Sequence, residues 1–179
     1  MSTEVAEELV VLLDADHRPA GTMPKAEVHG PDTPLHLAFS VYLFDSGGRL
    51  LVTRRALGKR TWPGVWTNSC CGHPGPGEDP AAAATRRLGQ ELGLRPDRLE
   101  LVLPDFTYRA VAADGIVEHE VCPVFFAHLD GPPEPAPAPD PEEVADWRWV
   151  PWAAFRAGAA TAPWALSPWA VEQVAALGG

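Results

Sequence analysis

The stretch of this chain richest in reactive side chains is residues 68–74, Asn-Ser-Cys-Cys-Gly-His-Pro, where two thiols and an imidazole lie close together. Such a group could form a disulfide, hold a metal ion or carry out acid-base catalysis. The chain has three cysteines, an odd number, and a bond between the neighbours Cys70 and Cys71 would close a strained ring. A structural disulfide is therefore disfavoured, and a metal ligand or a catalytic thiol remains.

Three histidines and two glutamates form a candidate metal-binding set. His29 and His36 flank one turn, and His73 follows the cysteine pair. Glu118 and Glu120 stand two residues apart in an apolar run, so in a strand both carboxylates point to the same face. This mixture of nitrogen and oxygen ligands is more typical of a Mn²⁺ or Mg²⁺ site than of a zinc site built from thiolates. Zn²⁺ is a further candidate. Each histidine alone would more often be structural, so the prediction depends on their convergence.

A phosphate-binding pattern follows directly. From Gly72 to Leu94 the chain reads Gly-x5-Glu-x7-Arg-Arg-Leu-Gly-Gln-Glu-Leu-Gly-Leu. This spacing resembles the Nudix box, a loop and helix whose glutamates hold divalent cations against a diphosphate. Two positions differ: Arg87 replaces a glutamate, and Gln90 precedes Glu91 where the box has two glutamates. The differences weaken a hydrolytic interpretation but keep a diphosphate-binding scaffold with Glu91 as a candidate Mg²⁺ ligand. The alternative is a solvated helix face with an Arg87–Glu91 ion pair.

The composition of the whole chain excludes some classes of function. A chain of 179 residues with 46% hydrophobic content predicts a single domain over 1–179, with a frayed tail at 1–8. The formal charge of −10 argues against binding of nucleic acid, because phosphate backbones are bound by clustered lysine and arginine. The sequence has neither a signal-peptide pattern nor an apolar run long enough to cross a bilayer. We therefore expect a cytoplasmic, monomeric protein whose partner is a small molecule.

The elements that position these residues are predicted from periodicity and turn signals. Strands are expected at 10–13, in a hairpin over 35–56, at 99–111, at 116–129 and at 144–150. The strongest helix signal starts at Asp79, a candidate N-cap, and ends at Leu92. Shorter helices are expected at 152–157 and 168–177, and the Pro-rich segment 130–143 should be a surface connector. This order predicts an α+β fold, a mixed β-sheet flanked by helices.

Six segments between Lys25 and Trp169 carry a more detailed pattern. They read HGPDTPLHLAFS, LLVTRRALGKRTWPGVWTNSCCGHP, RRLGQELG, PDFTYRA, GIVEHEVCPVF and TAPWALSPW. Together they resemble type I isopentenyl diphosphate isomerase. That resemblance implies a Nudix-type fold and an enzyme of isoprenoid biosynthesis, which interconverts isopentenyl and dimethylallyl diphosphate by adding and removing a proton.

The resemblance also assigns roles to residues of this chain. It implies catalytic roles for Cys71, Glu120, Tyr108 and Trp164, with Trp164 facing the hydrocarbon end. It implies that one cation is held by His29, His36, His73, Glu118 and Glu120. It implies a Mg²⁺ on Glu91 that bridges the phosphates, and diphosphate contacts from Lys25, Arg55, Lys59 and Arg87.

The chemistry of such an isomerase explains these residue types. Protonation of an unactivated alkene creates a tertiary carbocation that water would trap, so the cavity must be dry and must stabilise positive charge. An acid and a base on opposite sides of the carbon skeleton, with an indole face near the cation, meet this need. Two alternatives remain at this point. One is a Nudix pyrophosphohydrolase of a nucleoside diphosphate derivative, and the other is a non-catalytic module that binds a metal or a diphosphate.

Overall fold

The computed structural model describes residues 8–178, and most of the tail predicted at 1–8 lies outside this range. Its strands are β1 Leu9–Leu13, β2 Pro19–Pro24, β3 His36–Leu37, β4 Phe39–Phe44, β5 Arg49–Arg55, β6 Trp66–Thr67, β7 Cys70–Gly72, β8 Arg98–Leu103, β9 Thr107–Val111, β10 Val117–Val121, β11 Val124–His128 and β12 Val144–Pro151. Its helices are α1 Lys25–Val28, α2 Pro80–Leu92, α3 Trp152–Thr161, the 3-10 turn η1 Pro163–Ala165 and α4 Pro168–Ala176.

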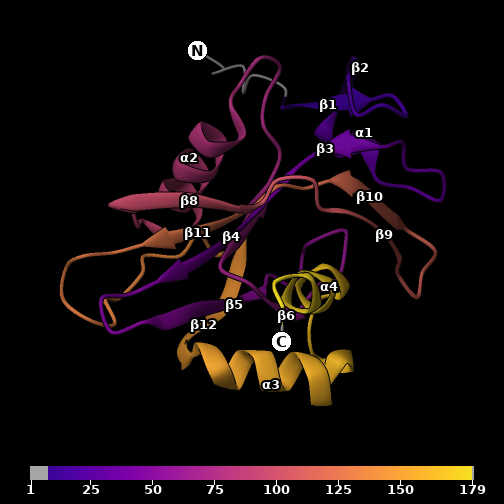
Figure 1. Ribbon diagram of the computed structural model, residues 1–179. Helices are drawn as coiled ribbons and strands as arrows, with labels where there is room; N and C mark the ends of the chain where they lie inside the picture. Colours follow the sequence, from indigo (N-terminus) through magenta and orange to yellow (C-terminus); the bar gives the residue numbers. More distant parts are fainter. Residues whose placement is uncertain (1–7, 179) are drawn as a thin grey trace, which may run out of the picture.

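The strands form two sheets. The small sheet has the order β2-β1-β3-β10-β9, and the large sheet has the order β12-β5-β4-β11-β8, with β6 paired to β5 and β7 paired to β4. Helix α2 lies on one side of the large sheet, and α3 and α4 lie on the other (Figure 1). Both sheets contain parallel and antiparallel pairs. The predicted α+β fold is therefore confirmed.

Strand β4 is buried along its whole length because it has helices on both faces. Side chains alternate along a strand, so Phe39 and Val41 pack in the cluster that contains α2. Tyr42 and Phe44 point the other way and pack in the cluster that contains α3 and α4. The polar residue on this second face, Ser40, is also fully buried.

Helix α2 forms as its end signals predict. The Asp79 carboxylate accepts hydrogen bonds from two backbone N–H groups of the first turn. Gly93 ends the helix with φ of 66°, a left-handed conformation that glycine adopts without strain. The inward face of the helix includes two charged residues, Arg87 and Glu91. Helix α2 therefore brings two charged side chains into the interior as well as packing against the sheet.

Three chain segments cross between the small sheet and the large sheet. The runs 99–111 and 116–129, expected as two long strands, each divide into two strands that belong to different sheets. The divisions fall at Pro104 and Pro123, because proline has no N–H to offer a strand ladder. The run over 35–56 likewise contributes β3 to the small sheet before the predicted hairpin of β4 and β5.

Other elements differ from the expected ones in extent. Residues 130–143 form neither helix nor strand, and helix α3 is longer than the 152–157 expected. Strands β2, β6 and β7 and the short helix α1 are absent from the sequence prediction. The two-residue and three-residue strands β6 and β7 are too short to show a periodicity, and they exist because β5 and β4 offer them an edge.

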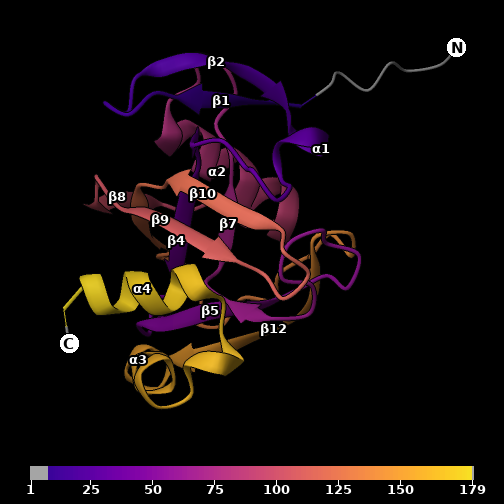
Figure 2. The same ribbon diagram turned by 90° about the vertical axis from the view of Figure 1, so that its right-hand side faces the viewer.

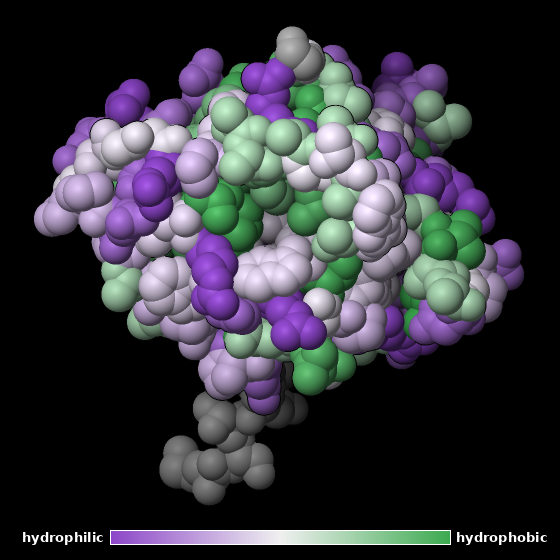
Figure 3. All heavy atoms as spheres, turned by 90° about the horizontal axis from the view of Figure 1, so that it is seen from below, coloured by the Kyte–Doolittle hydropathy of each residue, from purple (hydrophilic) through white to green (hydrophobic). Residues whose placement is uncertain are grey.

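The outer surface shows no large apolar face on the side seen in Figure 3, where hydrophobic side chains are scattered among hydrophilic ones. Within residues 8–178, no helix combines the length and the apolar character needed to cross a membrane.

Candidate active site and metal centre

Three histidines and one glutamate meet where the small sheet joins the rest of the molecule. Each of His29, His36, His73 and Glu120 offers one ligand atom, and these atoms lie within 4.8 Å of one another. Chain topology brings them together, since β10 pairs in parallel with β3 and places Glu120 opposite His36. The Nε2 atoms of His36 and His73 lie 3.3 Å and 3.1 Å from Oε1 of Glu120. Four of the five predicted ligands thus converge.

The donor set of this cluster fits a divalent cation. Nδ1 of His36 lies 2.9 Å from the carbonyl oxygen of Pro34 and is oriented by it, so Nε2 is left to face the cluster. Among the described residues, Nε2 of His36 and Nδ1 of His73 are buried atoms without a hydrogen-bond partner. Buried unpaired nitrogens are costly, and a metal ion bound by the imidazoles would remove that cost at His36.

The fifth predicted ligand, Glu118, lies at the edge of the cluster. Its Oε2 is 3.2 Å from Nε2 of His29, and its carboxylate is not among the four groups that converge. Burial and the nearby charge of Glu120 raise the pKa of Glu118. Burial also acts to raise the pKa of Glu120, but the imidazoles of His36 and His73 beside its Oε1 bring it well below its usual value. The two carboxylates therefore differ in their tendency to hold a proton.

Tyr108 is held directly against Glu120. The antiparallel pairing of β9 with β10 sets these two residues opposite each other, and the Tyr108 hydroxyl donates a hydrogen bond of 2.8 Å to Oε2 of Glu120. Burial raises the pKa of the Tyr108 hydroxyl well above its usual value. The phenol therefore keeps its proton at neutral pH and orients the carboxylate.

The two neighbouring cysteines point to opposite sides of β7. The Cys70 thiol is buried on the α2 side and donates to Oε2 of Glu91 at 3.4 Å. The Cys71 thiol is on the other side and donates to Oδ1 of Asn68 at 3.3 Å. Burial raises the pKa of Cys71 to about 11, so the group is a thiol at neutral pH. All three cysteines are free, as expected.

Cys71 and Glu120 line one cavity of about 600 Å³. Tyr108 and Trp169 line it as well, and the predicted phosphate-binding residues Lys25, Arg55, Lys59 and Arg87 all lie on its wall. His29, His73, Glu118 and Glu91 also line it. A thiol, a carboxylate, an indole and several cationic side chains therefore face one cavity, as an acid-base enzyme with an anionic substrate requires.

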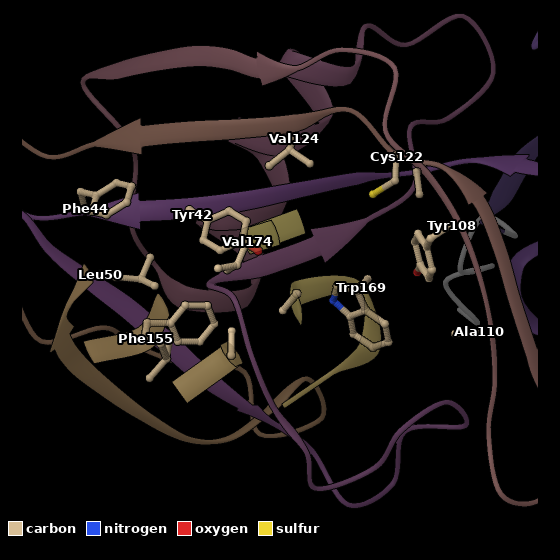
Figure 4. Close-up of a cluster of buried hydrophobic side chains, with 14 residues drawn as sticks. Tyr42, Phe44, Leu50, Tyr108, Ala110, Cys122, Val124, Phe155, Trp169 and Val174 are labelled. Atoms are coloured by element: carbon tan, nitrogen blue, oxygen red, sulfur yellow. The ribbon is translucent and has the colours of Figure 1, made fainter. Parts of the chain in front are cut away.

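The structure places Trp164 differently from the prediction. Trp164 lies in η1, is 81% exposed and does not line the cavity. Trp169 is 2% exposed, and its ring lies 6.0 Å from that of Tyr108 at one end of the buried cluster shown in Figure 4. The tryptophan that lines the cavity is therefore Trp169. The sequence signal for the burial of Trp169 was helical spacing, since Trp169, Ala170, Gln173 and Val174 share one face of α4.

Three basic residues of the cavity are paired with carboxylates. Lys25 contacts Glu8 at 2.7 Å, and Lys59 contacts Glu143 at 2.5 Å. Arg87 pairs with Glu91 in the same helix and with Glu143 at 3.2 Å. Sequence reasoning missed Glu8 and Glu143, because no local pattern marks a carboxylate whose partner lies many residues away.

Arg55 and Glu91 are held differently. The Arg55 guanidinium donates to the carbonyl oxygen of Thr61 and lies 5.2 Å from the centre of the Trp169 ring. Glu91 is buried, which raises its pKa, although Arg87 opposes this shift. Both residues face the cavity, and Glu91 lies outside the four-residue cluster.

Comparison with known proteins identifies the family of the chain. A model of the NUDIX domain matches residues 34–170. An isopentenyl-diphosphate Delta-isomerase of Frankia alni is 66% identical over 169 residues, which is 94% of this chain and 85% of that protein. One of Mycolicibacterium vanbaalenii is 62% identical over 93% of this chain and 90% of that protein.

Solved structures share the fold at much lower identity. DR0079 from Deinococcus radiodurans aligns with a TM-score of 0.71 at 18% identity, over 96% of this chain and 100% of its own. The MutT protein from Methanosarcina mazei Go1 aligns with a TM-score of 0.62 at 14% identity, over 80% of this chain and 93% of its own. At these identities the likeness concerns the fold alone.

Proposed function

The chain belongs to the isopentenyl-diphosphate Delta-isomerase family of NUDIX-domain proteins, and we propose that it interconverts isopentenyl and dimethylallyl diphosphate. The observation that carries the proposal is the single cavity lined by Cys71, Glu120, Tyr108 and Trp169. A thiol and a carboxylate on one small cavity provide two proton-transfer groups, which is what moving a double bond by one carbon requires.

The reaction adds a proton at the terminal carbon of the alkene and removes one from the carbon on the other side of the tertiary cation. Cys71 and Glu120 are the groups that give and take these protons, and they exchange roles between the two directions. Tyr108 holds the Glu120 carboxylate in place through its hydrogen bond. A divalent cation bound at His29, His36, His73 and Glu120 would polarise the Glu120 carboxyl.

The cationic wall would hold the diphosphate. Arginine presents paired donors to phosphate oxygens, and lysine adds a point charge. We assign this role to Lys25, Arg55, Lys59 and Arg87, and Glu91 would hold a Mg²⁺ that neutralises charge on the diphosphate. The cluster of three histidines and Glu120, with Glu118 at its edge, would take Mn²⁺, Mg²⁺ or Zn²⁺.

One assay tests the function. The protein is incubated with isopentenyl diphosphate and Mg²⁺ in heavy water, and both products are followed. Deuterated dimethylallyl diphosphate without phosphate release is the expected result. Phosphate release would instead identify a hydrolase, and the absence of both products would identify a binding module.

The two tryptophans of the C-terminal segment should behave differently. We expect Trp169→Leu to lower kcat about tenfold, because an indole face contributes about 0.5 to 2 kcal/mol to a nearby cation. Trp164→Leu should leave kcat within about twofold, because that side chain is 81% exposed and outside the cavity. Steady-state kinetics on both variants decides, and a larger loss for Trp164→Leu would return the aromatic role to Trp164.

The two proposed metal positions can be separated by substitution. We expect His73→Gln to lose the ion that copurifies with the protein, measured as metal content per chain. Glu91→Gln should retain that ion but lose most of the Mg²⁺-dependent affinity for inorganic pyrophosphate, measured by calorimetry. Equal metal content in wild type and His73→Gln would argue against the histidine cluster as a metal site.

A further inference from the structure

A chain of buried polar side chains lies directly behind Cys71. Ser40 and Tyr42 of β4 and Gln173 of α4 are all fully buried, on the face of the large sheet that α3 and α4 cover. Buried hydroxyl and amide groups are costly unless each finds a partner. The hydrogen bonds that satisfy these three groups lead to the sulfur of Cys71.

The direction of the hydrogen bonds follows from the donors available. The Tyr42 hydroxyl donates to Oε1 of Gln173 at 2.9 Å, and Nε2 of Gln173 donates to Oγ of Ser40 at 2.9 Å. Because Oγ of Ser40 accepts from the amide, its own proton is directed elsewhere. The atoms within reach are two sulfurs, Cys71 at 3.4 Å and Cys122 at 3.3 Å.

Two observations favour Cys71 as the acceptor of the Ser40 proton. Cys122 already lies within 3.9 Å of Nε2 of Gln173, which has a second proton to donate. The Cys71 thiol donates its own proton to Asn68, so its sulfur lone pairs are free to accept from Ser40. The Cys71 sulfur is thus held between an acceptor on one side and a donor on the other.

Asn68 is itself fixed in place. Its amide nitrogen donates to the carbonyl oxygens of Val41 and Cys70, each at 3.0 Å. Its Oδ1 also accepts from Nε1 of Trp169 at 3.2 Å. Helix α4 therefore reaches the surroundings of Cys71 twice, through Trp169 to Asn68 and through Gln173 to Ser40.

We propose that Ser40 is a positioning residue for Cys71: its hydroxyl, oriented by Gln173 of the C-terminal helix, donates to the sulfur and holds it toward the cavity. This rests on the proposed function only in taking Cys71 as a proton-transfer group. Positioning has large effects on rate because a displacement of about 1 Å at a reacting group can cost on the order of 100-fold.

The first test is structural and independent of activity. Crystal structures of the wild type and Ser40→Ala are compared at the Cys71 side chain. We expect a single Sγ position facing the cavity in the wild type, and a rotated or divided position in the variant. An unchanged Sγ in Ser40→Ala would overturn the proposal whatever reaction the protein catalyses.

The second test is kinetic. Ser40→Ala should lower kcat at least tenfold with KM within about twofold, because the diphosphate contacts are untouched. Gln173→Met in the Ser40→Ala background should cause no further loss of kcat, since both changes break the same chain. Tyr42→Phe, at the far end of the chain, is the matched control and should stay within about threefold of wild type.

A Cys122 variant separates the two possible acceptors. Cys122→Ala alone should retain activity, and Ser40→Ala should still lower kcat by the same factor in the Cys122→Ala background. Disappearance of the Ser40 effect in that background would mean that Ser40 acts through Cys122 and would overturn the proposal. The stoichiometry of Mg²⁺-pyrophosphate binding measures the fraction of each variant that is folded. A fall in kcat of Ser40→Ala no larger than the fall in this fraction would also overturn the proposal.

Inactivity of the wild type would contradict the proposed function, and the crystallographic comparison would still decide the role of Ser40.

Discussion

Cys71→Ser will lower the turnover of isopentenyl diphosphate by about 100-fold to 10,000-fold, with little change in the affinity for inorganic pyrophosphate. Loss of a proton-transfer group has effects of this order on the chemical step. The diphosphate wall is formed by other side chains of the cavity, so binding should survive. Turnover is measured by the heavy-water assay and affinity by calorimetry with Mg²⁺ present.

The neighbouring cysteine is the matched control. Cys70→Ser makes the same chemical change one position away, but on the side of β7 that faces α2 and Glu91. We expect this variant to stay active within about tenfold, because its sulfur lies away from Asn68 and Ser40. If Cys70→Ser were inactive and Cys71→Ser active, the choice between the neighbours would be reversed.

Glu120→Gln should also lower turnover by about 100-fold or more. Glu120 is the contact point of Tyr108, His36 and His73, and its pKa lies well below the usual value, so it enters the reaction ionised. An amide cannot take up a proton in its place. Turnover and metal content are measured on the same preparation, so that a loss of chemistry is distinguished from a loss of the ion.

Glu118→Gln provides the comparison for this prediction. Glu118 is equally buried but contacts only the edge of the cluster through His29. We expect a smaller effect on turnover and a retained ion. A Glu118 variant that lost as much activity as the Glu120 variant, at full metal content, would move the acid-base role from one carboxylate to the other.

Elements with strong local signals were predicted well from the sequence. Helix α2 has a capping aspartate and a left-handed glycine at its ends, and the hairpin of β4 and β5 has two glycines at its turn. The crossings between the sheets were missed, because apolar residues lie on both sides of Pro104 and of Pro123, and an apolar run does not say which sheet a strand joins. Which ladder a strand joins depends on neighbours distant in the sequence.

In the candidate site, too, local spacing was predictable from the sequence and long-range contacts were not. Glu118 and Glu120 were placed on one face by their spacing, and the convergence of His29, His36 and His73 with Glu120 follows from how β3 and β10 pair. No spacing rule excludes Glu118 from that group, because the distances among the ligand atoms are set by the tertiary structure.

The aromatic assignment failed for a related reason. The motif TAPWALSPW contains two tryptophans, and the choice between them depends on where η1 ends and α4 begins. Ser167 caps α4 and turns Trp169 into the interior, whereas Trp164 in the preceding turn faces solvent. A cap and a helix face were visible in the sequence, but the packing of that face against the cavity was not.

The carboxylates that contact Lys25, Lys59 and Arg87 change how an anion enters the cavity. A diphosphate that binds here would replace Glu8 and Glu143 as the partners of cationic side chains whose charge these carboxylates already neutralise. The Lys59–Glu143 pair is the more buried of the two, so breaking it is costly, and a ligand must bring enough negative charge to replace the Glu143 carboxylate. The pocket should therefore discriminate by charge, rejecting alcohols and monophosphates of the same hydrocarbon chain.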